Sequence, residues 1–436
     1  MKSKFLCVIA SICSIAALKA QEQHITLQQA VELALKNSDN AKLADAKLYT
    51  AENKLAITKN LQYPDATLSG QYMYLTNANV DLKLNLNSNS DESSNNASPT
   101  INQLMLGQAN ISMPIFLGFK LKNTVKAAEN SYKAASLNAK NDKEKLALQV
   151  IEQYINLYKV NQSIILIQEN LKSAKQRVKD FTSMEKNGLL ARNDLLKAQL
   201  QESDIELSLE EAIKNERILN YKLITLLKIP KKTAILTSSD DFEIIPLDIT
   251  NDSIARNDFR AMKYQLKAAE NQIIIARSKY YPSISLSGGY IALDLHNALT
   301  VTNAMNAGVG ISYNLSDIFK TKSDIKFAKS KVKELEYSIN TFSDAIKVQI
   351  KNAQEEYQLA NKQYQVYIKS VQQAIENYRI VKDKHNNGLL NTNDLLEADV
   401  EQLKAKINLA YAKANISLKY YELLSAEGQL INKITN

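Results

Sequence analysis

The feature that most constrains this chain is an internal duplication. Tyr63-Pro64 opens the segment YPDATLSGQYMYL, and Tyr281-Pro282 opens the similar segment YPSISLSGGYIAL. The tetrapeptide Asn-Gly-Leu-Leu occurs at 187–190 and again at 387–390. The first pair of segments is separated by more residues than the second, and the excess falls within 76–103, a stretch rich in Asn and Ser. Separations of this length exceed those of solenoid repeats and predict two half-molecules built on one plan.

Each copy contains two segments in which apolar and polar residues alternate. In MLGQANISMPI (105–115) the odd positions are mostly apolar and the even ones largely polar, and 305–315 repeats the pattern. Such a period of two predicts strands with one apolar and one polar face. Segments of ~10–12 residues suffice to cross a bilayer as tilted strands. The strands alone are equally compatible with a soluble sheet that has one wet face.

Very long helices follow the strands. Residues 120–187 contain no proline, and apolar residues recur every seven positions from Val150 through Leu157 to Val178. This heptad pattern predicts coiled-coil-like packing, and a helix of that length spans ~100 Å. Further helices are expected over 39–62, 193–229, 253–280 and 393–428. Two shorter helices placed end to end have nearly the length of one long helix, which suggests the wall of a tube. The segment 230–252 and the two termini would then form a belt halfway along this tube.

The turns after the long helices have recognisable ends. Gly188 and Gly388 are predicted to be the residues just past each helix, since glycine accepts the left-handed conformation. Asn193 and Asn393 are the predicted N-caps of the returning helices, which places Asp194 and Asp394 in the first turn.

The N-terminus is predicted to be an export signal. Residues 1–20 begin with Lys2 and Lys4, continue with an apolar run and end at Ala20. Cys7 and Cys13 are the only cysteines, so the mature chain has no thiol for a disulfide, a metal or a nucleophile.

The remaining composition argues against an enzyme. The three histidines, His24, His296 and His385, are scattered along the chain, and no Gly-rich phosphate loop or nucleophile motif is present. We therefore expect no catalytic, cofactor-binding or metal-binding residues. The formal net charge is +8, but the lysines are spread among acidic residues along the helices, so no nucleic-acid partner is expected.

Several segments together resemble the TolC-type outer-membrane efflux proteins. These are ITLQQAVELALKNS (25–38), the Tyr-Pro strands, ISMPIFLGFK (111–120) and the twin NGLL…NDLL turns. The resemblance covers essentially the whole mature chain. Asn314 stands where the family usually has a proline in the second copy, which puts only the local turn in question.

The resemblance implies a mainly α fold with membrane β-structure. Helical hairpins of three chains would form an α-barrel in the periplasm, and four strands per chain would form a twelve-stranded β-barrel in outer-membrane lipid. The implied function is a passive exit duct of a tripartite efflux or type I secretion system, opened by docking of a periplasmic adaptor and an inner-membrane pump. The implied segments are a signal peptide (1–20), N-terminal helices (21–62), a first transmembrane hairpin (63–117) with an extracellular loop (76–103), a first helical hairpin (118–229), an equatorial segment (230–252), a tunnel helix (253–280), a second transmembrane hairpin (281–317), a second helical hairpin (318–428) and a C-terminal tail (429–436).

The resemblance also assigns roles to the turns. Asp394 and Glu397 match acidic positions that ring the periplasmic aperture, and Asp194 matches a position of closing contacts, with Arg192 as a possible partner. The adaptor-docking positions are Gly188, Leu189, Leu190, Gly388, Leu389 and Leu390. Two simpler interpretations stay open: the carboxylates cap helices, and the leucines staple the turns internally. Leu390 stands where the family can hold a gating arginine, which favours apolar contacts there.

Two other classes of protein remain as alternatives. An exported structural coiled-coil protein explains the heptads but leaves the four alternating strands unexplained. A periplasmic adaptor is expected to have one helical hairpin, whereas this chain has two hairpins with paired strands.

Overall fold

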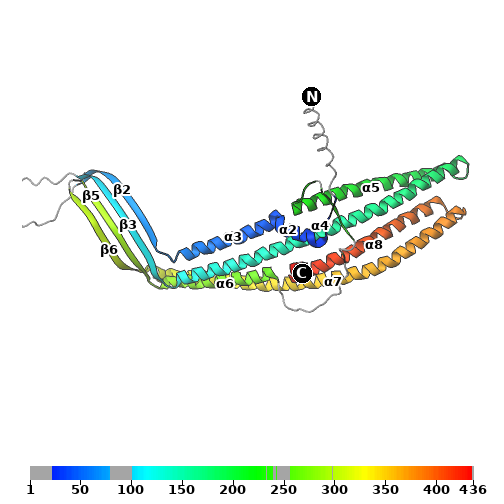
Figure 1. The fold of residues 1–436 in the computed structure, drawn as a ribbon. Coiled ribbons are helices and arrows are strands. Elements are labelled where there is room, and N and C mark those ends of the chain that lie inside the picture. Colours follow the sequence, from blue (N-terminus) through cyan, green and yellow to red (C-terminus); the bar gives the residue numbers. More distant parts are fainter. Residues whose placement is uncertain are drawn as a thin grey trace, which may run out of the picture. The chain divides into compact units, whose positions relative to one another are not determined.

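A computed structural model describes residues 22–78, 101–231, 233–238, 242, 256–296 and 298–434 (Figure 1). The predicted signal peptide, most of the predicted loop 76–103 and much of the segment 230–252 lie outside these residues. The chain forms two compact units. One consists of Met1–Leu48, Ala135–Ala261 and Ile339–Asn436, and the other of Tyr49–Ala134 and Met262–Ser338.

The second unit holds a four-stranded antiparallel sheet in the order β2-β3-β5-β6 (Figure 1). The strands are β2 (Asp65–Ala78), β3 (Ile101–Leu117), β5 (Ser283–Leu295) and β6 (Leu299–Ser312). Within the described residues, β2 and β6 each pair on one side only, so the sheet of a single chain has two edges.

The strand register places the predicted apolar residues on one face. Directly opposite residues in an antiparallel sheet share a face, and one such row is Leu68, Ala109, Tyr290 and Met305. Leu68 is 87% exposed and Met305 is 81% exposed, so nothing in the described part of the chain covers these positions. The neighbouring row on the opposite face is Thr67, Asn110, Gly289 and Asn306.

Helical segments join all four strands at one end of the sheet. α3 (Asp39–Asn60) leads into β2, α4 (Lys120–Lys186) follows β3, α6 (Asn257–Arg277) and the short helix η2 (Ser278–Tyr280) lead into β5, and α7 (Asp317–Asn386) follows β6. Gly118 makes a close junction contact: its φ is +60°, and an added Cβ would lie 2.4 Å from the Ser278 carbonyl oxygen. Phe116, Phe119 and Tyr281 pack edge-on around it.

The second junction uses different chemistry. When the turn at Gly188 is aligned with the turn at Gly388, Asn314 matches Pro114. Its Oδ1 accepts hydrogen bonds from the Ser316 backbone N–H (3.2 Å) and hydroxyl (2.8 Å). A side chain that mimics a backbone turn thus leads into α7 in the second copy.

The first unit is built from two helical hairpins. α4 continues through the turn at Gly188 into α5 (Arg192–Leu227), and α7 continues through the turn at Gly388 into α8 (Thr392–Glu427). The expected limits of α4, α5 and α8 agree with these bounds to within two residues, whereas α6 begins four residues after the expected 253 and ends three before the expected 280. The predicted heptad positions are buried along much of α4: Val150, Leu157, Ile167, Leu171, Ala174 and Phe181.

The described residues nearest each terminus and the segment after α5 share one core with the middle of α4. β1 (Glu22–His24) pairs in parallel with β4 (Ala234–Leu236), and the Tyr154 hydroxyl of α4 donates to the Ile25 carbonyl at 2.9 Å. α2 (Leu27–Asn37) and α9 (Leu430–Ile434) pack into the same cluster. The predicted C-terminal tail therefore contains a short helix. No described helix is both long and apolar enough to cross a membrane.

Candidate functional site

The two hairpin turns have the same backbone geometry. The Gly188 N–H donates to the Glu185 carbonyl at 3.0 Å, and the Leu189 N–H donates to the Met184 carbonyl at 2.9 Å. The second turn repeats both bonds from Gly388 and Leu389. Gly188 and Gly388 have φ of +70° and +71°, as predicted, because the left-handed residue after a helix end is usually glycine.

The predicted N-caps, Asn193 and Asn393, are wrong. The N-cap of α8 is Asn391, whose side chain accepts from the Asp394 N–H at 3.1 Å, while the Asp394 carboxylate accepts from the Asn391 N–H at 3.3 Å. In the first copy Ala191 occupies the N-cap of α5 and makes no side-chain bond. The helix begins where the chain leaves the turn, so Asn193 and Asn393 already lie in the first helical turn.

The acidic residues therefore differ between the copies. Asp394 serves as a cap and is half-buried, whereas Glu397, one turn further along α8, is exposed. Asp194 lies 3.5 Å from the Lys197 ammonium. In the single chain Arg192 pairs with Glu185 at 3.6 Å, and Asp194 with Lys197.

The paired leucines divide between solvent and core. Leu189 and Leu389 are each 72% exposed, at the extreme end of their hairpins. Leu190 and Leu390 are half-buried, and Leu190 packs against the cluster of Phe181, Leu195, Ala198 and Leu395. One leucine of each pair is therefore largely exposed, while the other is half-buried.

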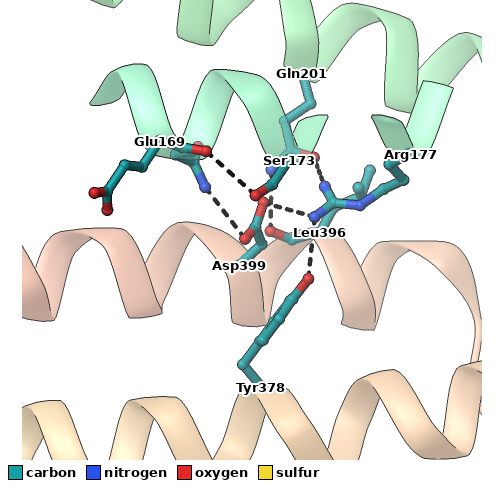
Figure 2. A network of polar contacts seen from close by, with 8 residues as sticks. Glu169, Ser173, Arg177, Gln201, Tyr378, Leu396 and Asp399 are labelled. Carbon is teal, nitrogen blue, oxygen red and sulfur yellow. Dashed lines mark hydrogen bonds and ion pairs between the residues drawn. The ribbon is translucent and has the colours of Figure 1, made fainter. Parts of the chain in front are cut away.

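A buried ion pair ties the two hairpins together behind the turns (Figure 2). The Arg177 Nη2 of α4 donates to the Asp399 Oδ2 of α8 at 2.9 Å, and the two side chains are only 9% and 3% exposed. Arg177 also donates to Gln201 on α5 at 3.0 Å and to the Tyr378 hydroxyl on α7 at 3.3 Å. Asn170 donates to the other carboxylate oxygen of Asp399 at 3.2 Å. All four helices of the tip thus meet in one polar network.

The electrostatics of the network favour a charged pair. Burial works against the charged guanidinium, but the charge and hydrogen bond of Asp399 outweigh it and hold the pKa of Arg177 above its ordinary value. A buried arginine with bonds to carboxylate, amide and hydroxyl oxygens has its donors largely satisfied. The network is therefore a structural tie between hairpins.

Sequence reasoning missed this network, although the repeat contains a signal for it. With the two turns aligned, Arg177 matches Asn377 and Gln199 matches Asp399. The two charges therefore occur where the copies disagree. Asp399 also follows Leu395 by one helical turn, which places a carboxylate on the buried face of α8.

Comparison with known proteins identifies the class. The family model "Outer membrane efflux protein" matches residues 30–217 and 253–429, and the chain belongs to this family. It is an outer-membrane protein of the efflux-channel class.

Individual relatives agree with this assignment. The outer membrane efflux protein BepC of Brucella suis is 21% identical over 327 residues, which cover 73% of this chain and 71% of BepC. The CmeC outer membrane channel of Campylobacter jejuni has the same fold, with a TM-score of 0.77, 19% identity and coverage of 95% of this chain and 90% of CmeC. The open state of the Neisseria gonorrhoeae MtrE outer membrane channel aligns with a TM-score of 0.75 and 18% identity, over 95% of this chain and 93% of MtrE.

Proposed function

We propose that three copies of this chain form a passive exit duct for efflux or type I secretion. Their twelve strands would close into one barrel in the outer membrane, and their hairpins would enclose a tunnel in the periplasm. Docking of an adaptor and an inner-membrane pump at the hairpin tips would open it. The observation that carries the proposal is the four-stranded sheet, which within the described residues has two edges and an uncovered apolar face.

The two unpaired edges of the sheet require a partner if the sheet lies in a membrane. Unpaired backbone N–H and C=O groups are too costly to place in lipid, so membrane sheets close on themselves. Four strands are too few for a barrel with a lumen, and edge pairing of β6 with β2 of another copy would close the sheet. The exposed apolar row of Leu68 and Met305 would then face lipid, and the row of Thr67 and Asn306 would face water.

Cysteine cross-linking tests the edge pairing. Because the mature chain is expected to have no thiol, a double variant with one cysteine on β2 (Leu68→Cys) and one on β6 (Met305→Cys, Ala307→Cys or Val309→Cys) contains only the introduced pair. We expect at least one combination to give disulfide-linked trimers on denaturing gels, and the single-cysteine variants to give none above dimer. Exclusively intramolecular disulfides in all three combinations would contradict the trimer.

The acidic tip residues would form the aperture. Asp394 and Glu397 lie one turn apart on α8, so three chains would bring six carboxylates to one narrow opening. Such a ring attracts cations and repels anions. Asp194 would contribute closing contacts between neighbouring hairpins, and the exposed Leu189 and Leu389 with their glycine turns would dock the adaptor.

Neutralising the ring is expected to change conduction. In Asp394→Asn with Glu397→Gln, which keeps the shape of both side chains, we expect higher single-channel conductance in planar bilayers. Block by trivalent cations should weaken roughly tenfold, because each ion loses several nearby opposite charges. The matched control is Asp344→Asn with Glu355→Gln, two exposed acidic residues on α7 far along the chain from the turn. Equal block in both double variants would exclude the ring assignment.

A further inference from the structure

The positive charge of this protein is concentrated in the helices next to the sheet. Their parts within the second unit, residues 49–60, 120–134, 262–280 and 317–338, contain 16 Lys and Arg but only 7 Asp and Glu. The resulting net charge of +9 exceeds the +8 of the entire chain, so the rest of the chain is close to neutral. Lysines alternate with acidic residues along all the long helices, but the excess of positive charge lies in these segments.

Nine of these cations lie near the helix ends that meet the sheet, and all nine are exposed. Six of them form three matched pairs near the starts of the two long helices when the copies are aligned on Gly188 and Gly388, and the other three lie at or near the ends of α3, α6 and η2. We call the nine the basic collar: Lys59, Lys120, Lys122, Lys126, Arg277, Lys279, Lys320, Lys322 and Lys326.

Local structure gives little reason for this charge. The first turn of α4 contains no acidic residue, although a helix N-terminus favours anions and disfavours cations. Lys279 pairs with Asp324 at 2.7 Å and Lys59 with Glu129 at 3.8 Å. Within the described residues, the other seven cations of the collar form no ion pair with an acidic side chain. The collar therefore carries positive charge that the described part of the chain leaves largely unbalanced.

The collar lies at one end of the sheet. The register pairs Asp65 with Ser112, Leu117 with Ser283, and Ser283 with Ser312, so the four strand ends that join helices are neighbours. Lys126 is less than two turns into α4, or about 9 Å from its start, which is close to the Debye length of ~8 Å at physiological salt. Exposed tyrosines accompany the collar at this end: Tyr63, Tyr280, Tyr281 and Tyr313.

We propose that the basic collar binds the phosphate headgroups of anionic phospholipids in the leaflet on the helical side of the barrel. This rests on the proposed function, which places the apolar sheet face in lipid. Exposed tyrosines and lysines next to an apolar band match the preferences of a membrane–water interface. Each lysine near an anionic lipid surface strengthens binding roughly fivefold, and a trimer would present three such collars around the barrel.

Lipid selection by the intact protein tests the proposal. The full-length protein is reconstituted in mixed phosphatidylcholine and phosphatidylglycerol, extracted in polymer-bounded discs, and the retained lipid is quantified against the bulk mixture. We expect the wild type to enrich phosphatidylglycerol severalfold. Lys120→Gln, Lys122→Gln, Lys320→Gln and Lys322→Gln combined should return the ratio to roughly that of the bulk, and added salt at roughly 0.5 M should reduce the wild-type enrichment because it screens exposed charges.

The control removes equal charge from the same helices. The control variant carries Lys140→Gln, Lys145→Gln, Lys347→Gln and Lys351→Gln. These four lysines lie about 20 Å or more beyond the last collar residue of the same helix, beyond the reach of a screened headgroup charge, so the variant should retain the enrichment. Equal enrichment of phosphatidylglycerol in both quadruple variants would overturn the proposal that the basic collar binds anionic lipid. Stronger binding of a soluble polyanion than of phosphatidylglycerol vesicles would overturn the lipid assignment. Trimer formation and channel conductance, measured on the same samples, report separately on the proposed function.

Discussion

Replacing Asp399 by alanine is expected to destabilise the hairpin tip by about 3–5 kcal/mol. The substitution leaves the Arg177 guanidinium, which is 9% exposed, without its counter-charge. The Gln201 and Tyr378 oxygens remain as acceptors, but neither carries a charge. Hydrogen exchange of the backbone amides around Arg177 and Leu395 measures the effect directly, and we expect exchange to accelerate there while the core around Tyr154 keeps its protection.

Two controls separate the loss of an interaction from general damage. Combining Arg177→Leu with Asp399→Leu removes both charges, and we expect it to recover most of the stability, since a buried ion pair is often replaceable by apolar side chains. The exposed pair Arg379–Glu376 on α7 (2.8 Å) provides the second control, because exposed pairs contribute little. If Asp399→Ala leaves the exchange of the tip unchanged, the network does not hold the hairpins together.

Sequence periodicity predicted the elements well because each is long and strongly patterned. The alternation in 105–115 fits only a strand that has Met105 and Ile111 on the same face, as β3 does. In α4, the apolar residues of the heptad pattern are largely the residues that the structure buries. The N-caps failed for a local reason. Asn391 and Asn393 are both good capping residues, and only the exit path of the chain from the turn at Gly388 selects the first.

Tertiary polar contacts were harder to foresee than the helices. Arg177 and Asp399 lie in different hairpins, far apart along the chain, and no local rule pairs them. The duplication does point to these two residues. The sequences of the two copies are the same where both hairpins form the same turn, and they differ at Arg177 and Asp399, where one hairpin packs against the other. The same comparison explains why the acidic residues after the two turns differ: Asp394 has a capping partner in Asn391, whereas Asp194 follows Ala191 and pairs with Lys197.

The largest pH-dependent effect is expected at Glu144 of α4, whose carboxyl is close enough to Arg256 and Asp258, at the start of α6, to feel their charges. Its residue is 7% exposed, and burial raises the pKa of its carboxyl to about 7, with the Asp258 charge adding to the effect and Arg256 opposing it. Arg256 is held by Asp258 at 2.7 Å and Gln349 at 2.6 Å, and Gly428 at the end of α8 packs directly on its backbone. The ion pair therefore leaves Glu144 without a dedicated counter-charge.

The sign of the pH dependence follows from the raised pKa. A carboxyl that titrates near 4.5 in the unfolded chain and near 7 in the folded one stabilises the fold when protonated. This contribution is complete below about pH 4.5 and is lost as the pH rises through about 7, a change of about 3 kcal/mol. Glu144→Gln keeps the neutral form at every pH, so we expect it to raise the unfolding temperature at pH 8 and to change it little at pH 4.5. Glu169→Gln, an exposed glutamate on the same helix, should leave the wild-type pH profile intact. A Glu144→Gln profile as steep as that of the wild type would show that Glu144 is not the titrating group.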